Sequence, residues 1–319
     1  MATGKMLSDA DYMRRALQLA RNGIFDAHPN PMVGAVIVAP DGRIIGEGWH
    51  RRCGEGHAEV NAVAMVRDEA EFLTATMYVT LEPCSHYGRT PPCAELIISK
   101  RIPRVVVGCL DPFEKVSGHG VKMLRDAGVD VTVGVLEEEC RQLNVRFITA
   151  HTRRSPYVIL KWAESADGYI DGRISTPLTS VMVHRLRAVA DGILVGSGTA
   201  LADDPRLDVR LAGGKDPVRV VLDRRGRLDG SAAVFRDDNV ILVTDVERDF
   251  IPAERQITGC RSLGEVLSEL YRRNIVTLLV EGGAEVHRSF IEEKLWDEVR
   301  VEQGAAYIAG KVKAPEFKM

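Results

Sequence analysis

The residues best suited to chemistry are one histidine and two cysteines in the first third of the chain. His57 is followed by Cys84 and then, nine positions later, by Cys93. An imidazole and two thiolates suit Zn²⁺, and three protein ligands leave a fourth position for water. This donor set therefore predicts a metal site with an open coordination position, which is typical of catalytic rather than structural zinc.

A carboxylate lies beside this donor set, because Glu59 follows His57 by two positions. Bound zinc lowers the pKa of its water to about 7, and a carboxylate is then needed to carry protons. Residues two apart in a helix point to nearly opposite sides, so both side chains can face one site only if His57 lies in an irregular first turn. Gly54 and Gly56 permit such a turn. We therefore expect Glu59 to carry protons rather than to bind the metal.

The order of these residues matches the general pattern of zinc deaminases, His-x-Glu followed by Pro-Cys-x-x-Cys. The chain departs from this pattern because eight residues, 85–92, separate its two cysteines. His86 and Arg89 lie in this wider loop and are available to bind a polar substrate. The alternatives are three unrelated residues or a structural zinc that lacks one ligand. We favour a catalytic metal, because His-x-Glu, Pro-Cys and a second cysteine occur together across a loop rich in Gly and Pro.

Four segments together resemble a known enzyme family, the bifunctional deaminase–reductases of riboflavin biosynthesis. They are residues 30–34 (NPMVG), 48–50 (GWH), 57–59 (HAE) and the block 83–93 (PCSHYGRTPPC). The resemblance implies a cytidine-deaminase-like, three-layer first domain. Its reaction would be hydrolytic removal of the 2-amino group of 2,5-diamino-6-(5-phosphoribosylamino)pyrimidin-4-one.

The same resemblance implies a role for each residue of the first site. His57, Cys84 and Cys93 would hold one zinc per deaminase domain, a zinc-activated water would attack C2, and Glu59 would shuttle protons. The positions that match substrate contacts are Asn30, His50, His86 and Arg89.

The elements that must position these residues follow an α/β pattern. Apolar runs predict strands at 33–39, 77–81, 105–108 and 129–133, and helices at about 57–69, 93–99, 119–126 and 136–150. Ser8 and Asp11 predict the start of a first helix. Strands that alternate with helices at this spacing favour a largely parallel sheet. A polar stretch ending in proline, 151–156, predicts a linker, so we expect a deaminase domain over 1–150 and a reductase domain over 156–319.

The second half gives weaker signals when its residues are taken alone. The standard dinucleotide pattern Gly-x-Gly-x-x-Gly fails, because its third glycine position is Leu201. Gly282 and Gly283 follow a predicted strand and could bring backbone N–H groups to a phosphate, or serve only a tight turn. Arg187 and Arg210 could bind a phosphate or be ordinary surface charges.

The order of motifs in the second half again resembles the riboflavin family, whose reductase domain is similar in fold to dihydrofolate reductase and uses NADPH. The resemblance implies hydride transfer from NADPH to C1 of the opened ribose, which gives a ribityl chain. Matching positions for the substrate are Ser175, Arg187, Leu207, Arg210 and Glu281. Matching positions for the cofactor are Lys161, Thr199, Asp203, Gly282 and Gly283. Pro177 departs from the family pattern, where a tryptophan that touches the cofactor is usual.

Composition is that of an ordinary folded protein. The 319 residues include 42 Lys and Arg against 45 Asp and Glu, a formal charge of −3, and 45% are hydrophobic. These values exclude fibrous and disordered classes and give no broad electrostatic footprint for nucleic acid or a membrane surface. No apolar run approaches the ~20 residues of a membrane span. Without a signal-peptide core, we expect a cytoplasmic chain whose six cysteines are thiols or metal ligands.

The sequence thus predicts a bifunctional enzyme of riboflavin biosynthesis, a zinc-dependent hydrolase joined to an NADPH-dependent oxidoreductase. Its expected partner is a small phosphorylated pyrimidine, and homo-oligomer formation stays open. One alternative is a deaminase whose second domain only binds a nucleotide or regulates. Others are a zinc-stabilised scaffold and a nucleic-acid base deaminase, and the long cysteine loop disfavours the latter.

Overall fold

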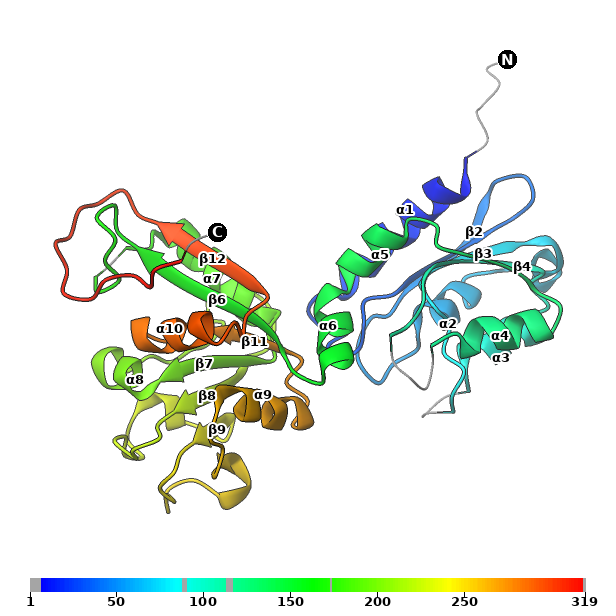
Figure 1. The fold of residues 1–319 in the computed structure, drawn as a ribbon. Coiled ribbons are helices and arrows are strands. Elements are labelled where there is room, and N and C mark those ends of the chain that lie inside the picture. Colours follow the sequence, from blue (N-terminus) through cyan, green and yellow to red (C-terminus); the bar gives the residue numbers. More distant parts are fainter. Residues whose placement is uncertain (1–6, 88–90, 113–116, 173, 318–319) are drawn as a thin grey trace. The chain divides into compact units, whose positions relative to one another are not determined.

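The chain folds into two compact units, Met1–Thr152 and Arg153–Met319 (Figure 1). The computed structural model describes residues 7–87, 91–112, 117–172 and 174–317. None of the helices within these ranges is long and apolar enough to cross a membrane.

The first unit contains one five-stranded sheet with helices on both faces. Its elements are α1 Asp9–Ala20, a 3₁₀ turn Arg21–Gly23, β1 Gly34–Val38, β2 Ile44–Trp49, α2 Ala58–Val63, a 3₁₀ segment Glu69–Thr74, β3 Thr76–Leu81, α3 Cys93–Ser99, β4 Arg104–Cys109, α4 His119–Asp126, β5 Asp130–Val133, α5 Glu137–Leu143 and α6 Val145–Arg153. The predicted start of the first helix is confirmed, because Ser8 and Asp11 form a capping box at the N-terminus of α1.

The expectation of a largely parallel sheet is wrong for this unit. The strand order is β2-β1-β3-β4-β5, and β1 runs antiparallel to both of its neighbours while β3, β4 and β5 are parallel. β2 could not be predicted from the sequence, because Gly46 and Gly48 interrupt its apolar pattern. A Cβ at Gly48 would lie 2.4 Å from the carbonyl oxygen of Ala58, and one at Gly46 would lie 2.3 Å from that of Ala62. Both glycines therefore let α2 lie directly on the sheet.

Side chains along each strand point alternately to the two faces of the sheet, so helices pack on both faces and the unit has three layers. On β1, Ala35 and Ile37 face a core that includes residues of α2, α3 and α4. Val36 and Val38 face the opposite core, which is shared with α1 and with Cys140 of α5. Strands buried on both faces read as continuous apolar runs, which is why β1, β3 and β4 were predictable from sequence.

Two further expectations about this unit need correction. The helix expected over 57–69 ends at Val63, and that expected over 136–150 is divided into α5 and α6. The segment 151–156 is not a linker throughout, because α6 continues to Arg153 and β6 begins at Tyr157.

The second unit contains a seven-stranded sheet in which every pair of neighbouring strands is parallel. Its strand order is β10-β9-β8-β7-β11-β6-β12. The elements are β6 Tyr157–Glu164, α7 Pro177–Ala188, β7 Gly192–Gly196, α8 Ser197–Asp203, β8 Val218–Leu222, a 3₁₀ turn Ala233–Phe235, β9 Val240–Val243, a 3₁₀ turn Ala253–Arg255, β10 Gln256–Ile257, α9 Leu263–Arg272, β11 Thr277–Val280, α10 Ala284–Glu292 and β12 Glu298–Gln303. One core packs α9 and α10 against a face of the sheet.

Candidate functional sites

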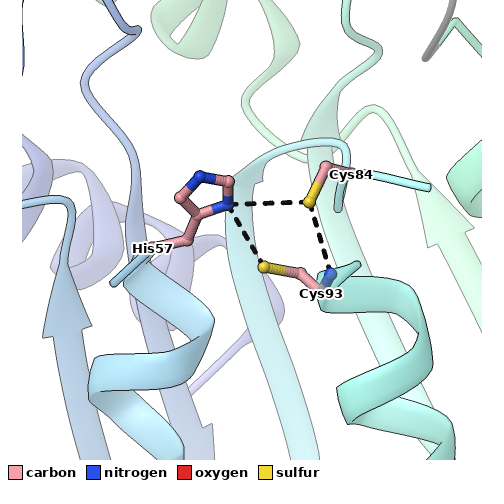
Figure 2. A group of neighbouring side chains, drawn as sticks. All are labelled: His57, Cys84 and Cys93. Atoms are coloured by element: carbon pink, nitrogen blue, oxygen red, sulfur yellow. Dashed lines mark hydrogen bonds between the residues drawn. The ribbon is translucent and has the colours of Figure 1, made fainter. Parts of the chain in front are cut away.

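One histidine and two cysteines meet in the first unit (Figure 2). His57 Nδ1 lies 3.6 Å from Cys84 Sγ and 3.3 Å from Cys93 Sγ, and the three donor atoms all lie within 4.8 Å of one another. Zinc–sulfur bonds of about 2.3 Å and zinc–nitrogen bonds of about 2.0 Å in a tetrahedron place nitrogen and sulfur about 3.5 Å apart. The spacing of these atoms therefore fits three corners of a tetrahedral zinc site.

His57 and Glu59 reach the same place because His57 precedes the helix. It is the N-cap residue of α2, with extended backbone angles (φ −68°, ψ 171°), and Glu59 lies in the first helical turn. This is the irregular first turn that the spacing of two residues requires.

The two cysteines come from different elements of the long motif. Cys84 follows β3, and Cys93 is the first residue of α3, with its backbone N–H directed at Cys84 Sγ over 3.3 Å. Hydrogen bonds from Cys93 and then from His57 lower the pKa of Cys84 to about 4, whereas the pKa of Cys93 is raised beside it. A thiolate is thus favoured at Cys84, and thiolates are the form that binds metal.

Glu59 is only 3% exposed. Burial raises the pKa of its carboxyl group and outweighs the opposing effect of His57. A buried carboxyl group whose pKa is raised holds a proton more readily than an exposed one, which suits a group that exchanges protons.

Asn30 and His50 lie beside this cluster. His50 Nδ1 is 3.3 Å from the carbonyl oxygen of Gly56, and its Nε2 is 3.1 Å from Asn30 Nδ2. The carbonyl oxygen of Gly56 accepts a hydrogen bond from Nδ1–H, so Nε2 is left to accept one from the side-chain amide of Asn30. Burial lowers the pKa of His50, which favours this neutral form. The ring centroid of His50 is 5.3 Å from that of His57.

The remaining two predicted contacts of this unit lie in the cysteine loop. His86 is exposed, two residues after Cys84, so its side chain is open to a ligand. Arg89 lies outside the described residues.

Glu82 is a buried residue near the cluster that sequence reasoning missed. It is two positions before Cys84. Its carboxylate accepts hydrogen bonds from the backbone N–H groups of Gly118 (2.9 Å), Val121 (3.1 Å) and Asp111 (3.3 Å). The first two belong to the N-terminus of α4, so Glu82 caps that helix from the end of β3. An acid directly after a buried strand was the available signal.

In the second unit, Arg187 and Glu281 form a buried bidentate pair. The guanidinium donates from Nε to Oε1 (2.9 Å) and from Nη2 to Oε2 (2.7 Å), while Nη1 donates to the carbonyl oxygen of Asp208. Burial acts to raise the pKa of Glu281, but the hydrogen bonds from Arg187 outweigh it and the pKa is lowered. One edge of the Arg187 guanidinium is therefore already occupied by a carboxylate.

Arg210 is the more accessible cation. Its side chain is 56% exposed and pairs with the buried carboxylate of Asp208, which also lies 3.3 Å from Arg206. Two exposed guanidinium groups thus share one carboxylate and leave a net positive charge. Leu207, between them, is buried with a left-handed backbone (φ 53°). Arg206 and Asp208 were not singled out from sequence.

Lys161 and Ser175 are joined by another residue that sequence reasoning missed, Glu302 on β12. Its Oε2 accepts a hydrogen bond from Ser175 Oγ (2.7 Å) and lies 3.7 Å from Lys161 Nζ. Beside Ser175 is an open cavity of about 590 Å³ lined by Gly172, Ile174, Ser175, Pro177, Ser180, Val181 and Leu211.

The predicted cofactor turns also come together. Gly283 N donates to Thr199 Oγ1 (2.8 Å), and a Cβ at Gly282 would lie 3.1 Å from the nitrogen of Gly196. The turns into α8 and α10 are therefore in contact, and the N-terminus of α10 can present N–H groups to a phosphate. Asp203, at the end of α8, is exposed.

Two family models match the chain. Residues 6–109 match the cytidine and deoxycytidylate deaminase zinc-binding region, and residues 156–315 match the RibD C-terminal domain. The first contains the metal cluster and Glu59. The second contains all the residues of the second unit described above.

Relatives and solved structures are similar to this chain over nearly its whole length. The riboflavin biosynthesis protein RibD of Aquifex aeolicus is 40% identical over 319 residues, which cover 95% of this chain and 87% of that protein. A structure of RibD from Acinetobacter baumannii is similar with a TM-score of 0.88 and 34% identity, covering 98% of this chain and 91% of that one.

A structure from Thermotoga maritima, described as a diaminohydroxyphosphoribosylaminopyrimidine deaminase and 5-amino-6-(5-phosphoribosylamino)uracil reductase, has a TM-score of 0.87 and 40% identity. It covers 96% of this chain, and this chain covers 89% of it.

These matches give no support to a second domain that only binds a nucleotide. The pairing of domains implies zinc in the first unit and NADPH in the second. The chain therefore belongs to the RibD family of riboflavin biosynthesis, whose members join a deaminase to a reductase.

Proposed function

We propose that the first unit deaminates 2,5-diamino-6-(5-phosphoribosylamino)pyrimidin-4-one at C2, and that the second unit reduces the ribosyl chain of the product to ribityl. The observation that carries this proposal is the tetrahedral spacing of His57, Cys84 and Cys93 beside the buried Glu59. The Thermotoga maritima structure, described with both activities, supports the choice of substrate.

In the deaminase site, His57, Cys84 and Cys93 hold zinc. When bound there, zinc supplies a water molecule that is activated near neutral pH. The Glu59 carboxylate accepts a proton from the attacking water and delivers it to the departing amino group. Its burial supports this role, because a dry carboxyl group keeps a pKa closer to the working pH.

Four further side chains bind the substrate of the first site. Asn30 and His50 contact the pyrimidine beside the metal cluster, and their mutual hydrogen bond fixes the orientation of both. His86 and Arg89, from the loop between the cysteines, contact the ribosyl phosphate.

In the reductase site, the substrate lies among Ser175, Arg187, Leu207, Arg210 and Glu281. Arg210 binds the phosphate, because its guanidinium is exposed while that of Arg187 is held by Glu281. Arg187 keeps Glu281 ionised and oriented toward the substrate. The proposal thus gives different roles to the two arginines that the sequence offers for a phosphate.

NADPH supplies the hydride for this second reaction. Thr199, Asp203, Gly282 and Gly283 lie along the cofactor, and Lys161 lies near its nicotinamide end. The hydrogen bond between Thr199 and Gly283 supports this placement, because it joins the turn that enters α10 to the first turn of α8.

The test measures ammonia release and NADPH oxidation by the full-length protein given the diaminopyrimidine substrate. We expect one ammonia and one oxidised NADPH per substrate consumed. Ammonia release without NADPH oxidation would refute the proposed reduction, and absence of both would refute the proposed substrate. A substrate without the phosphate should react far more slowly if Arg210 binds it.

A further inference from the structure

We infer that Glu302 is a positioning residue of the reductase site, which holds the Lys161 ammonium group and the Ser175 hydroxyl in place for the substrate. This inference rests on the proposed reduction. Nothing in the family resemblance assigns a role to Glu302.

Strand register brings Glu302 to Lys161. β12 pairs with β6 in parallel, with Arg300 opposite Lys161 and Glu302 opposite Ala163. Side chains two residues apart on a strand share a face, so Glu302 and Lys161 are diagonal neighbours on one face of the sheet. Their side chains are 14% and 13% exposed, so this pair is shielded more than a surface ion pair.

A single carboxylate oxygen joins two separate segments. Glu302 Oε2 accepts from Ser175 Oγ over 2.7 Å and faces Lys161 Nζ over 3.7 Å. Ser175 directly precedes Thr176, whose capping box fixes the start of α7. The oxygen therefore contacts both Lys161 in the middle of β6 and Ser175, directly before the N-cap of α7, beside the cavity that Ser175 lines.

The positive charge of Lys161 explains why the Glu302 carboxylate is needed. Lys161 also acts on Glu281, but both oxygens of Glu281 already accept from Arg187. Among these four side chains, Glu302 is thus the acid whose charge remains to balance Lys161. Without it, the ammonium group would gain the freedom to move toward Glu281 or to solvent.

The position of Lys161 matters for the reduction. The bond between C1 of the ribosyl chain and the ring oxygen breaks first, with the lone pair of the amine nitrogen forming an iminium, and the oxygen takes a proton from water. C1 of the opened chain then gains a hydride from NADPH. A cation fixed beside this oxygen stabilises the charge that develops on it. A misplacement of about 1 Å can reduce such a rate by about 100-fold.

The first experiment compares E302Q with E298Q, the same substitution four residues earlier on β12. The amide oxygen of E302Q can still accept from Ser175, so only the charge opposite Lys161 is lost. We expect E302Q to lower kcat for reduction at least ~10-fold while KM for NADPH changes less than ~3-fold, and ammonia release to remain at the wild-type rate. E298Q should match the wild type in kcat for reduction, in KM for NADPH and in the rate of ammonia release.

A double-mutant cycle tests whether Glu302 acts through Lys161. If it does, the E302Q/K161Q variant is no slower than K161Q alone. If the two losses multiply, Glu302 does not act through Lys161 and the inference is overturned.

A spectroscopic test does not depend on turnover. Reductive methylation of the full-length protein with ¹³C-formaldehyde gives one dimethylamine signal per lysine, and the signal missing in K161Q belongs to Lys161. We expect E302Q, but not E298Q, to change the chemical shift of this signal, because the carboxylate 3.7 Å from Lys161 Nζ is lost. An unshifted Lys161 signal overturns the inference.

These readouts separate two failures. A wild-type protein that does not oxidise NADPH refutes the proposed reduction, while the methylation experiment still decides whether Glu302 holds Lys161. If E302Q does not fold, as judged by its Tm, E302D replaces it, since it keeps the charge at a shorter reach. Wild-type kcat and an unshifted Lys161 signal in E302D would then overturn the inference.

Discussion

At the scale of single residues, the two sites use buried carboxylates in different ways. Glu59 is buried without a basic partner that outweighs its desolvation, so its pKa is raised. Glu281 is buried against Arg187, so its pKa is lowered. The first environment suits a group that exchanges protons, and the second suits a group that stays charged.

The role of Glu59 gives the first prediction. Glu59→Gln should keep its zinc, because the carboxylate is not among the three donors, while deamination falls by about 10²–10⁴-fold. Metal analysis and ammonia release measure the two effects, and reduction of the deaminated intermediate serves as the control. Loss of zinc in this variant would refute the assignment of Glu59 as proton carrier.

Two acids that follow strands of the second sheet give the next prediction. Glu281→Gln leaves the buried Arg187 charge uncompensated and should lower the free energy of unfolding of this unit by about 3–5 kcal/mol. Asp245→Asn, whose carboxylate pairs with Arg224 at the surface, should cost less than about 1 kcal/mol. Urea unfolding followed by the fluorescence of Trp162 and Trp296 measures both.

The lowered pKa of Glu281 also fixes a pH dependence. Its stabilising contribution is fully present above the pKa of an unfolded glutamate, about 4.3, and is lost as the pH falls through the lower folded value. The difference in unfolding free energy between wild type and Glu281→Gln should therefore shrink only in strong acid. A difference that already shrinks between pH 7 and 5 would contradict this.

The site residues that could be predicted from the sequence differ from those that could not in how far their role depends on distant groups. His57, Cys84 and Cys93 have side chains whose chemistry is specific, so type and spacing were sufficient. Glu82 and Glu302 are ordinary acids whose meaning depends on distant groups, three backbone N–H groups for one and a lysine on a neighbouring strand for the other. No local pattern encodes those contacts.

At the scale of elements, β2 shows the same limit. Strand prediction from sequence depends on side chains that alternate, and the glycines of β2 remove that alternation because α2 occupies their space. The strands buried on both faces, by contrast, were predicted within one or two residues. Pairing direction in the first sheet could not be predicted, because the antiparallel β1–β2 hairpin depends on recognising β2.

The close approach of α2 to β2 leads to a prediction at this scale. Gly48→Ala places a Cβ against the backbone of α2 and should displace His57 and Glu59 together, so zinc affinity and deamination both fall. Competition with a chromophoric chelator measures the affinity. Gly264→Ala, whose new Cβ would lie 3.8 Å from the Ser262 hydroxyl oxygen, is the control and should change neither zinc affinity nor deamination. Wild-type affinity in Gly48→Ala would contradict this role of the glycine.

At the scale of the whole molecule, each unit contains the groups that we propose for one of the two reactions. Removal of zinc by a chelator should therefore abolish ammonia release and leave reduction of added deaminated intermediate unchanged. Arg210→Ala should do the reverse, raising KM for the intermediate at least ~10-fold without affecting deamination. If both activities fell together in either experiment, the assignment of one site to each unit would be wrong.

The contact between Glu82 and α4 has a consequence for measuring metal occupancy. The amide protons of Gly118 and Val121 are held by a side chain two residues before Cys84, although they lie more than 30 positions further along the chain. Their hydrogen–deuterium exchange reports how firmly that stretch of backbone is anchored. We therefore expect zinc binding to slow the exchange of these two amide protons, and unchanged exchange on removal of zinc would contradict this link.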